Sequence, residues 1–212
     1  MLYNWKIAFS NPYYRNRFII SVAFLILILI GFASLLAYIE TRQGHTFYDP
    51  ILNFIKPRDV SDFIFFVTYS AATVGFIYAI TSPYKFLHFI QMYGSLTLLR
   101  VITLFFIPLE PPIAIIPLRD EFLSHTFYAG SEHLKDLFFS GHAATLFLFY
   151  FFTHNKILKI TFLTAAIAVS IGVMVQHVHY SYDVIAAPIF AYIAYRVITK
   201  FSKHYQNDTP VV

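Results

Sequence analysis

The sequence predicts an all-α integral membrane protein, and two observations support this: its composition and its long apolar segments. Of its 212 residues, 58% are hydrophobic and only 12% are charged, with a mean hydropathy of +0.63. A soluble domain of this length could not bury so much apolar surface. Apolar segments near 20 residues match the hydrocarbon thickness of a bilayer, whereas the strands of a β-barrel are about ten residues of alternating polarity.

Six apolar segments indicate six transmembrane helices in a single domain that covers residues 1–212. We expect the spans at about residues 18–38, 60–80, 85–106, 138–152, 160–175 and 181–199. The first segment is longer than the apolar core of a signal peptide, about 7 to 15 residues, so it should remain as a membrane span. Residues 138–200 are expected to form the core that carries both histidine motifs described below.

The distribution of Lys and Arg predicts that both termini are cytoplasmic, because cytoplasmic loops carry the excess of basic residues. On the side of the termini lie nine: Lys6, Arg15, Arg17, Lys85, Lys156, Lys159, Arg196, Lys200 and Lys203. On the opposite side lie five: Arg42, Lys56, Arg58, Arg119 and Lys135. This bias explains the net charge of +4 without a nucleic acid partner. The sequence contains no cysteine, which excludes disulfides and thiolate metal sites.

The stretch of residues 136–144 places Ser140, Gly141 and His142 where a polar loop ends and an apolar helix begins. The first N–H groups of a helix lack internal partners and, together with the helix dipole, attract anions. Ser140 is a good N-cap, Gly141 lets a bulky anion approach the backbone, and His142 can donate or accept a proton. The triplet therefore predicts a phosphate site. The alternative is ordinary helix capping beside a satisfied histidine.

The link between the fifth and sixth spans holds a second histidine motif. If the sixth span begins here, His179 and Asp183 lie one helical turn apart on the same face, where the carboxylate can accept the imidazole N–H. That carboxylate would fix the tautomer and support the positive charge as the other ring nitrogen attacks an electrophile. The alternative is an aromatic belt at the membrane interface, formed with His177, Tyr180 and Tyr182.

Arg100 lies well inside the third apolar segment, where a cation costs roughly 2.5 kcal/mol or more unless it is paired or hydrated. We expect it to serve the phosphate site, because it lies toward the same membrane face as the Ser140 turn. The alternative is a side chain that extends to the lipid headgroups.

The connection of residues 108–135 is the longest polar segment, and connections of this length often form lids or binding loops. It leans acidic and contains Glu110, Arg119, Asp120, Glu121, His125, Glu132, His133 and Lys135.

Together these motifs resemble the type 2 phosphatidic acid phosphatase superfamily, most closely its sphingomyelin synthase-like branch. Residues 136–142 are similar to the Asp-x-x-x-Ser-Gly-His motif of that branch, and residues 179–184 to its His-Tyr-(Ser or Thr)-x-Asp-Val motif. Arg100 and Thr103 match its Arg-x-x-Thr in the third span. The resemblance covers about residues 90–195, and the six-span layout fits the first half in general terms.

The sequence departs from the patterns of this superfamily at three places. The Lys-x6-Arg-Pro motif of the phosphatase branch is absent, and Val173 stands where an Arg is expected six residues before the nucleophile. Leu134 and Lys135 replace the Cys-Gly pair that often precedes the aspartate in sphingomyelin synthases. By the resemblance, phosphate clamping therefore falls to Arg100 or to a loop residue.

The resemblance implies a lipid phosphotransferase or phosphatase that works through a histidine nucleophile and needs no metal or other cofactor. His179 would attack phosphorus in a phospholipid or sphingolipid, oriented by Asp183. His142 would protonate the departing alcohol and then deprotonate the incoming one. An incoming water would make the protein a phosphatase, and an incoming lipid hydroxyl would make it a transferase.

The resemblance also implies which residues bind the substrate. Ser140, Gly141 and Arg100 would hold the non-bridging oxygens, and Asp136 would contact a cationic headgroup. The substrate and the acceptor would both be membrane lipids. By the charge distribution, the site is expected on the extracytoplasmic face of the membrane. A bacterial inner membrane is preferred over a Golgi or endoplasmic reticulum membrane.

Two alternatives to this function stay open. A metal site would use His125, His133, His142 and His179, although no compact ligand motif such as His-Glu-x-x-His is present. A small transporter or structural membrane protein would spread polar residues through several spans and repeat broken segments in both halves. Here the polar residues gather at one predicted face, and no repeat between the halves is visible.

Overall fold

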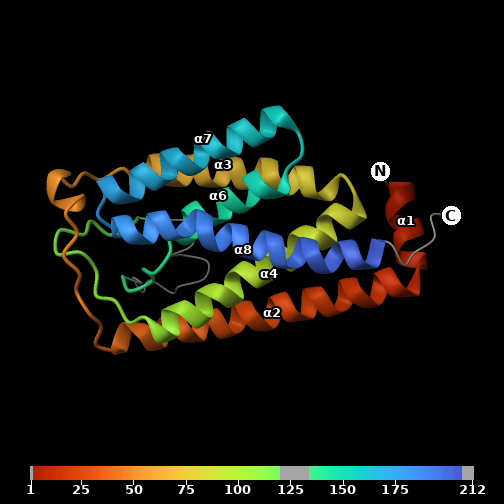
Figure 1. The fold of residues 1–212 in the computed structure, drawn as a ribbon, viewed down its shortest axis with the longest axis horizontal. Helices are drawn as coiled ribbons and strands as arrows, with labels where there is room; N and C mark the ends of the chain where they lie inside the picture. The colour runs from red at the N-terminus through yellow and green to blue at the C-terminus, as the bar shows by residue number, and fades with distance from the viewer. Residues whose placement is uncertain (1, 120–133, 207–212) are drawn as a thin grey trace.

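The computed structural model describes residues 2–119 and 134–206, which form seven α-helices and one 3-10 turn (Figure 1). The helices are α1 (Leu2–Ser10), α2 (Pro12–Thr41), α3 (Ser61–Ile80), α4 (Pro83–Phe106), α6 (Gly141–Phe152), α7 (Lys156–Val175) and α8 (Ser181–Gln206), and the turn is η1 (Leu52–Phe54). Within these ranges, the one β-bridge is an isolated pairing of His45 with Leu109. The all-α prediction is therefore confirmed for the described residues.

Five helices in the described ranges are long and apolar enough to cross a membrane: α2, α3, α4, α7 and the Ser181–Ser202 part of α8. They support the prediction of a multi-pass membrane protein. The span expected at 138–152 differs, because α6 has only 12 residues and extends about 18 Å, against about 30 Å of hydrocarbon. This helix starts later than predicted because Phe139 has a φ of 41°, a left-handed conformation that breaks helical geometry before Ser140.

Successive long helices run in opposite directions through the bundle (Figure 1). One end, called the site end below, holds the last residues of α2, α4 and α7 and the first residues of α3, α6 and α8. α1 lies at the opposite end, where α8 also finishes (Figure 1). The two ends of the described chain therefore lie on the same side of the bundle, which is compatible with the predicted topology.

Capping residues determine where α2 and α7 begin. The side-chain oxygen of Asn11 accepts a hydrogen bond from the Tyr13 N–H at 2.9 Å, and Pro12 occupies the first helical position. Asn155 accepts a hydrogen bond from the Ile157 N–H at 3.0 Å in the same way. Asparagine caps satisfy N–H groups that the helix leaves unpaired, and proline is favoured directly after them. The first long helix therefore begins earlier than the apolar segment alone predicts.

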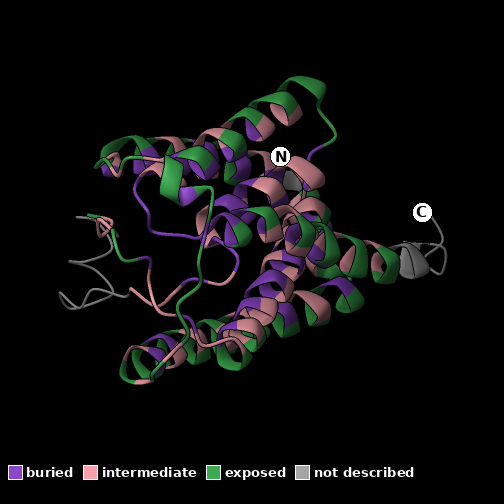
Figure 2. Cartoon of the chain, turned by 60° about the vertical axis from the view of Figure 1, so that its left-hand side comes forward, coloured by how far each residue is buried: buried purple, intermediate pink, exposed green. Residues whose placement is uncertain are grey.

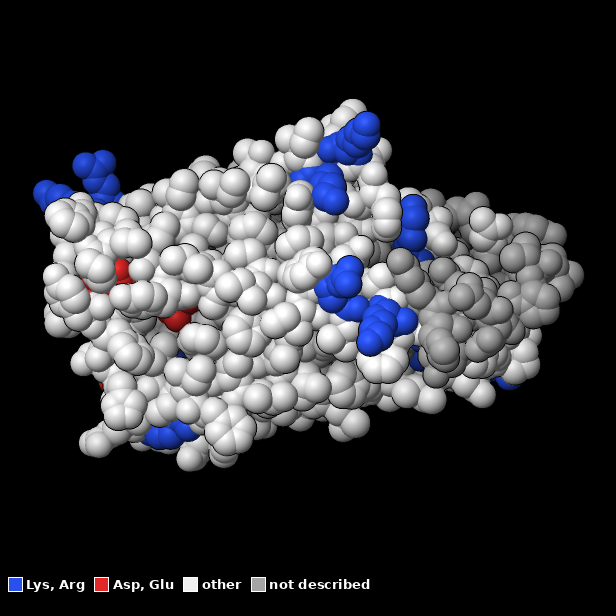
Figure 3. Space-filling model, viewed as in Figure 1, with Lys and Arg blue, Asp and Glu red and all other residues white. Residues whose placement is uncertain are grey.

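α6 forms the centre of the apolar core, whereas α2 lies at its edge. Leu146 and Leu148 of α6 are fully buried, while Ile20, Leu27 and Ile30 of α2 are 67%, 69% and 61% exposed. Exposed residues cover the outer faces of the helices, and buried residues face the inside of the bundle (Figure 2). An apolar surface of this extent fits contact with lipid chains. Charged side chains lie toward the two ends of the face shown in Figure 3, with an uncharged band between them, as expected of a helical membrane protein.

Gly75 of α3 packs against the ring of Phe149 on α6. A Cβ at this position would lie 2.3 to 2.6 Å from three atoms of that ring, and the ring is itself stacked between Phe89 and Phe162. We expect Gly75→Ala to lower the free energy of unfolding by about 1 to 3 kcal/mol, the usual cost of overpacking a core. The measurement is reversible unfolding in detergent micelles.

Gly31→Ala on α2 is the matched control, because nothing lies within 4 Å of the added Cβ. This substitution should leave stability unchanged or raise it by up to about 1 kcal/mol, since alanine favours helices more than glycine does. Equal losses in the two variants would contradict the close packing of α3 on α6.

Candidate active site

The turn that starts α6 carries a buried hydroxyl without a partner. Ser140 is the N-cap of α6, and its carbonyl accepts the first helical hydrogen bond from the Ala144 N–H at 2.8 Å. A serine N-cap normally also accepts a hydrogen bond from the helix through its side chain. The Oγ of Ser140 does not, and this fully buried atom has no hydrogen-bond partner. Unpaired buried polar atoms are uncommon, so this hydroxyl is a candidate ligand for a bound anion.

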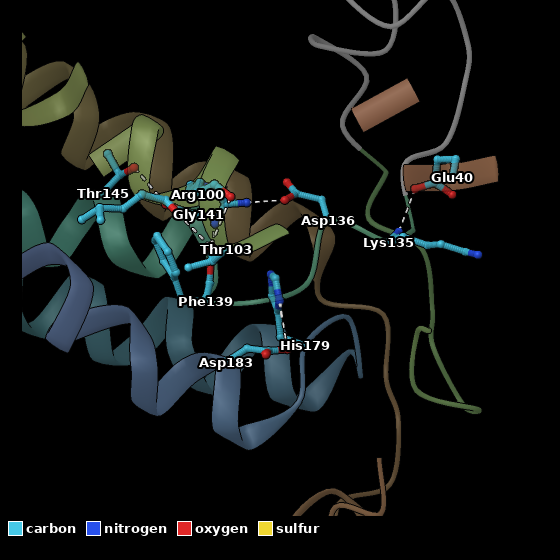
Figure 4. A network of polar contacts seen from close by, with 11 residues as sticks. Glu40, Arg100, Thr103, Lys135, Asp136, Phe139, Gly141, Thr145, His179 and Asp183 are labelled. Carbon is cyan, nitrogen blue, oxygen red and sulfur yellow. Dashed lines mark hydrogen bonds and ion pairs between the residues drawn. The ribbon is translucent and has the colours of Figure 1, made fainter. Parts of the chain in front are cut away.

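Arg100 of α4 lies directly against this turn (Figure 4). A Cβ on Gly141 would lie 3.0 Å from the Cζ of Arg100 and 3.1 Å from its Nη1, so a glycine lets the guanidinium approach the backbone. Arg100 donates hydrogen bonds to the Phe139 carbonyl and to the Asp136 carboxylate. Arg100 as a whole is only 6% exposed. These contacts within the protein do not favour the alternative of an arginine that extends to the headgroups.

Phe139 anchors the turn to α8. Its ring is fully buried and stacks on the ring of Phe190, with centroids 4.5 Å apart and an interplanar angle of 6°. Its left-handed backbone conformation accompanies the approach of its carbonyl to the Arg100 guanidinium. The guanidinium also lies 5.3 Å from the centre of the same ring, within the range of a cation–π contact. One residue thus links the Ser140 turn to both α4 and α8.

Asp136 has a different partner from the one expected. The sequence predicts contact with a cationic headgroup, but in the structure its carboxylate forms an ion pair with Arg100. The side chain of Asp136 remains 29% exposed and that of Arg100 only 8%. The carboxylate therefore occupies the guanidinium that the sequence analysis expects to bind phosphate.

Lys135 holds the segment that presents Asp136. Its backbone N–H donates to Glu40 at 2.7 Å, and its Nζ donates to Glu110 at 2.8 Å. The hydrogen bond from Lys135, followed by one from the Gly44 N–H, lowers the pKa of Glu110 below its usual range despite some burial. Lys135 thus has a structural role in holding the segment before α6.

His179 precedes α8 and does not lie on it. The condition for His179 and Asp183 to share one helical face is not met, because the helix begins at Ser181, in agreement with the expected span of residues 181–199. Their side chains still meet, with the His179 Nδ1 and the Asp183 Oδ2 3.7 Å apart, and both are almost fully buried. The same Oδ2 accepts a hydrogen bond from the Tyr180 N–H at 2.9 Å, as in a capping box. Asp183 thus has two contacts at once: its carboxylate caps the start of α8 and faces the imidazole of His179.

The two predicted motifs meet at the site end. The Ser140 N–H donates to the carbonyl of Asp183, at 3.4 Å, so the first turn of α6 touches the first turn of α8. His142, the second residue of α6, packs edge-to-face on Phe65 of α3, with centroids 5.7 Å apart. The predicted site residues therefore come from α4, α6, α8, the segment before α6 and the link before α8, and direct contacts connect Arg100 with Asp136 and Phe139, Asp183 with Ser140, and His179 with Asp183.

Asp49 is a buried residue of this region that the sequence analysis did not single out. Its carboxylate accepts hydrogen bonds from the N–H and the Oγ of Ser181, at 2.6 and 3.0 Å. Burial favours the neutral acid, but the hydrogen bonds from Ser181, Leu52 and Ile51 lower the pKa of Asp49 below its usual range. Asp49 is therefore charged at neutral pH. In the sequence it is one acidic residue in a polar loop, and no local pattern connects it to residue 181.

The aromatic-belt alternative fits only part of the link. His177 is buried and adopts a left-handed φ of 56°, and its Nε2 lies 2.9 Å from the Ile55 carbonyl. Tyr180 is buried as well, and its hydroxyl donates to the Glu110 carbonyl at 2.9 Å. The pKa of Tyr180 is raised, and burial of the side chain is the largest cause. Tyr182 is 50% exposed and is the member of the group that suits a membrane interface.

The metal alternative falls partly outside the described residues, because His125 and His133 lie between 119 and 134. The predicted loop residues Asp120, Glu121 and Glu132 lie there too. Within residues 2–119 and 134–206, no group of three or more His, Cys, Asp or Glu side chains is placed to hold a metal ion.

A scan against protein-family models and searches of curated proteins and of solved structures find no match to this chain.

Asp136→Asn removes the carboxylate that neutralises Arg100. We expect this change to lower the free energy of unfolding by about 2 to 3 kcal/mol. That is less than the 3 to 5 kcal/mol typical of breaking a fully buried pair, because Asp136 is partly exposed. The measurement is reversible unfolding in detergent micelles.

Arg119→Gln is the control for this loss. It breaks an ion pair with Asp59 that spans 3.7 Å and is largely exposed, so it should cost less than about 1 kcal/mol. If Asp136→Asn costs no more than this control, the buried guanidinium does not depend on Asp136.

Proposed function

We propose that the protein is a membrane lipid phosphotransferase or phosphatase that works through a histidine nucleophile. One observation carries the proposal: the buried guanidinium of Arg100 lies against Gly141 at the start of α6, in a turn that contacts Asp183 of the His179 motif. A helix N-terminus, a cation and an unpaired buried hydroxyl are suited to bind a phosphoryl group. An imidazole backed by a carboxylate is suited to attack it.

In the proposed first step, the Nε2 of His179 attacks phosphorus and the bond to the leaving oxygen breaks. Asp183 faces Nδ1, so Nε2 is the nitrogen left to react, and the carboxylate supports the positive charge on the ring. His142 gives its proton to the leaving oxygen. In the second step, His142 takes a proton from water or from a lipid hydroxyl, which attacks phosphorus and releases His179.

Arg100 binds the substrate by exchanging partners. A phosphoryl oxygen replaces the carboxylate of Asp136 on the guanidinium, and the Ser140 hydroxyl and the Gly141 N–H hold the remaining non-bridging oxygens. Asp136 is then released with its negative charge at the rim of the site. There it can contact a cationic lipid headgroup, the role that the motif resemblance implies.

The motifs and the antiparallel bundle support membership of the type 2 phosphatidic acid phosphatase superfamily, in its sphingomyelin synthase-like branch. In this proposal, the short α6 and the segment before it together form a sixth crossing of the membrane. Both termini are then cytoplasmic and the site end is extracytoplasmic, in agreement with the distribution of Lys and Arg. A bacterial inner membrane is the proposed location.

Replacing either site histidine should abolish turnover of a phospholipid labelled in its headgroup, assayed in detergent micelles. His179→Ala removes the nucleophile, so its rate should fall to background. His142→Ala removes the general acid and base, so its rate should fall by about 100-fold or more.

His154→Ala is the control for both variants, because His154 is exposed in the turn between α6 and α7, at the other end of α6. It should keep the wild-type rate. Normal turnover in His179→Ala would rule out the mechanism, and transport of the intact labelled lipid without its turnover would favour a carrier.

EDTA should leave the rate of headgroup release unchanged. In the proposed mechanism, Arg100 and the start of α6 supply the positive charge that stabilises the transition state. The assay compares rates before and after treatment with EDTA, and after addition of zinc to the treated protein. Loss of activity that zinc restores would favour the metal alternative.

A further inference from the structure

Residues 45–55, in the loop between α2 and α3, contact the link that carries His179 at three successive places. The Ile55 carbonyl lies 2.9 Å from the ring of His177, and Asp49 binds Ser181. In the third contact, the Phe47 N–H donates to the hydroxyl of Tyr180, which lies between His177 and Ser181 in the link, at 3.4 Å. We call residues 45–55 the clamp. It holds the link on both sides of His179.

Asp49 makes the strongest of these contacts. Its Oδ2 accepts from the Ser181 N–H at 2.6 Å, and its Oδ1 accepts from the Ser181 hydroxyl at 3.0 Å. The same Oδ1 accepts from the N–H groups of Ile51 and Leu52, at 2.9 and 3.2 Å, which fixes the carboxylate within its own turn. The residue is 4% exposed. A buried carboxylate at the N-terminus of α8 is favoured both by charge-assisted hydrogen bonds and by the helix dipole.

The side chain of His179 depends on this support, because its own contacts are weak. Its Nδ1 is buried without a hydrogen bond, and the nearest carboxylate oxygen, 3.7 Å away, is already bonded to the Tyr180 N–H. The direction of the imidazole therefore depends on the packing around the buried ring and on the backbone of residues 177–181, with little help from hydrogen bonds of its own. A nucleophile must be held within a fraction of an ångström of its attack position, and a displacement of about 1 Å can cost 100-fold in rate.

We infer that Asp49 is a positioning residue for the nucleophile: by binding the N–H and hydroxyl of Ser181, it holds the backbone that aims His179 at the phosphoryl site. The catalytic part of this inference rests on the proposed function. Asp49 contacts neither the substrate nor the reacting atoms and acts through the link. Asp49 belongs to the loop between α2 and α3, whereas His179 belongs to the link between α7 and α8. A residue from the first part of the chain therefore supports the nucleophile in the last part.

Asp59 provides a matched control within the same loop. It binds Ser61, the first residue of α3, in the same way, with its Oδ1 accepting from the Ser61 N–H at 3.1 Å and from the hydroxyl at 2.8 Å. These hydrogen bonds from Ser61 lower the pKa of Asp59, as those from Ser181 do for Asp49. α3 carries none of the predicted site residues, and the side chain of Asp59 is 41% exposed, whereas Asp49 is buried. The Ser61 hydroxyl also accepts a hydrogen bond from Gln176, directly before His177, so Asp59→Asn shows how far a lost carboxylate in this loop disturbs the link without removing a bond to Ser181.

The experiment compares Asp49→Asn with Asp59→Asn and the wild type in detergent micelles, using two readouts. The first is hydrogen–deuterium exchange of the peptide that contains residues 178–184. Asp49→Asn should speed this exchange at least tenfold, and Asp59→Asn should change it less than twofold. The second is turnover of headgroup-labelled phospholipid. Asp49→Asn should lower kcat by about 10- to 100-fold while KM changes less than twofold, and Asp59→Asn should change neither.

The inference is overturned if residues 178–184 exchange at the same rate in Asp49→Asn and the wild type, whether or not the protein turns over lipid. Faster exchange with an unchanged kcat overturns the catalytic part. A wild type that turns over no phospholipid overturns the proposed function and the catalytic part together, while the exchange readout still decides whether Asp49 holds the link.

Ser181→Ala is a second variant, which decides the question if Asp49→Asn does not fold. It removes one of the two bonds between Asp49 and Ser181 and leaves the backbone bond. It should lower kcat by about threefold and speed exchange to an intermediate degree, and no change in either readout overturns the inference.

Discussion

The site end depends on how one buried cation is neutralised. Arg100 is 6% exposed in an apolar helix, where an unpaired charge would cost several kcal/mol. It is neutralised by the Asp136 carboxylate and the Phe139 carbonyl, and position 141 must carry no side chain to let the guanidinium approach. These requirements draw the segment before α6 onto α4. The left-handed Phe139, the late start of α6 and the burial of Ser140 all accompany this contact.

The same arrangement means that an anion that binds the guanidinium on the side of Asp136 competes with a partner inside the protein. A phosphoryl group that displaces Asp136 gains one ion pair and breaks another, so the net gain on binding the substrate is small. Weak binding of the ground state is compatible with catalysis, because only interactions that strengthen in the transition state raise the rate. On the proposed function, Arg100 contributes most when charge builds up on the phosphoryl oxygens.

Much of the fold could be predicted from the sequence, because apolar segments that end at polar or turn residues mark the limits of membrane helices. The predicted ends at residues 80, 106 and 175 coincide with those of α3, α4 and α7. The start of α6 could not be predicted, since it depends on the contacts of Phe139 with Phe190 and Arg100.

The candidate site shows the same limit. Residue types and spacing predicted two histidine motifs, and the expected span at 181–199 already placed His179 before α8. They did not predict that Asp49 binds a residue 132 positions away.

On the proposed function, α6 covers only about 18 Å of a hydrocarbon layer about 30 Å thick, and the non-helical residues 134–140 replace helix at one side of the membrane. None of the residues of α6 is exposed, so other helices of the bundle, and not lipid, surround it. A headgroup that reaches Arg100 would therefore descend into the protein while its acyl chains stay in one leaflet. Water would follow the headgroup by the same route, so the depth of the site bears on whether water or a second lipid receives the phosphoryl group.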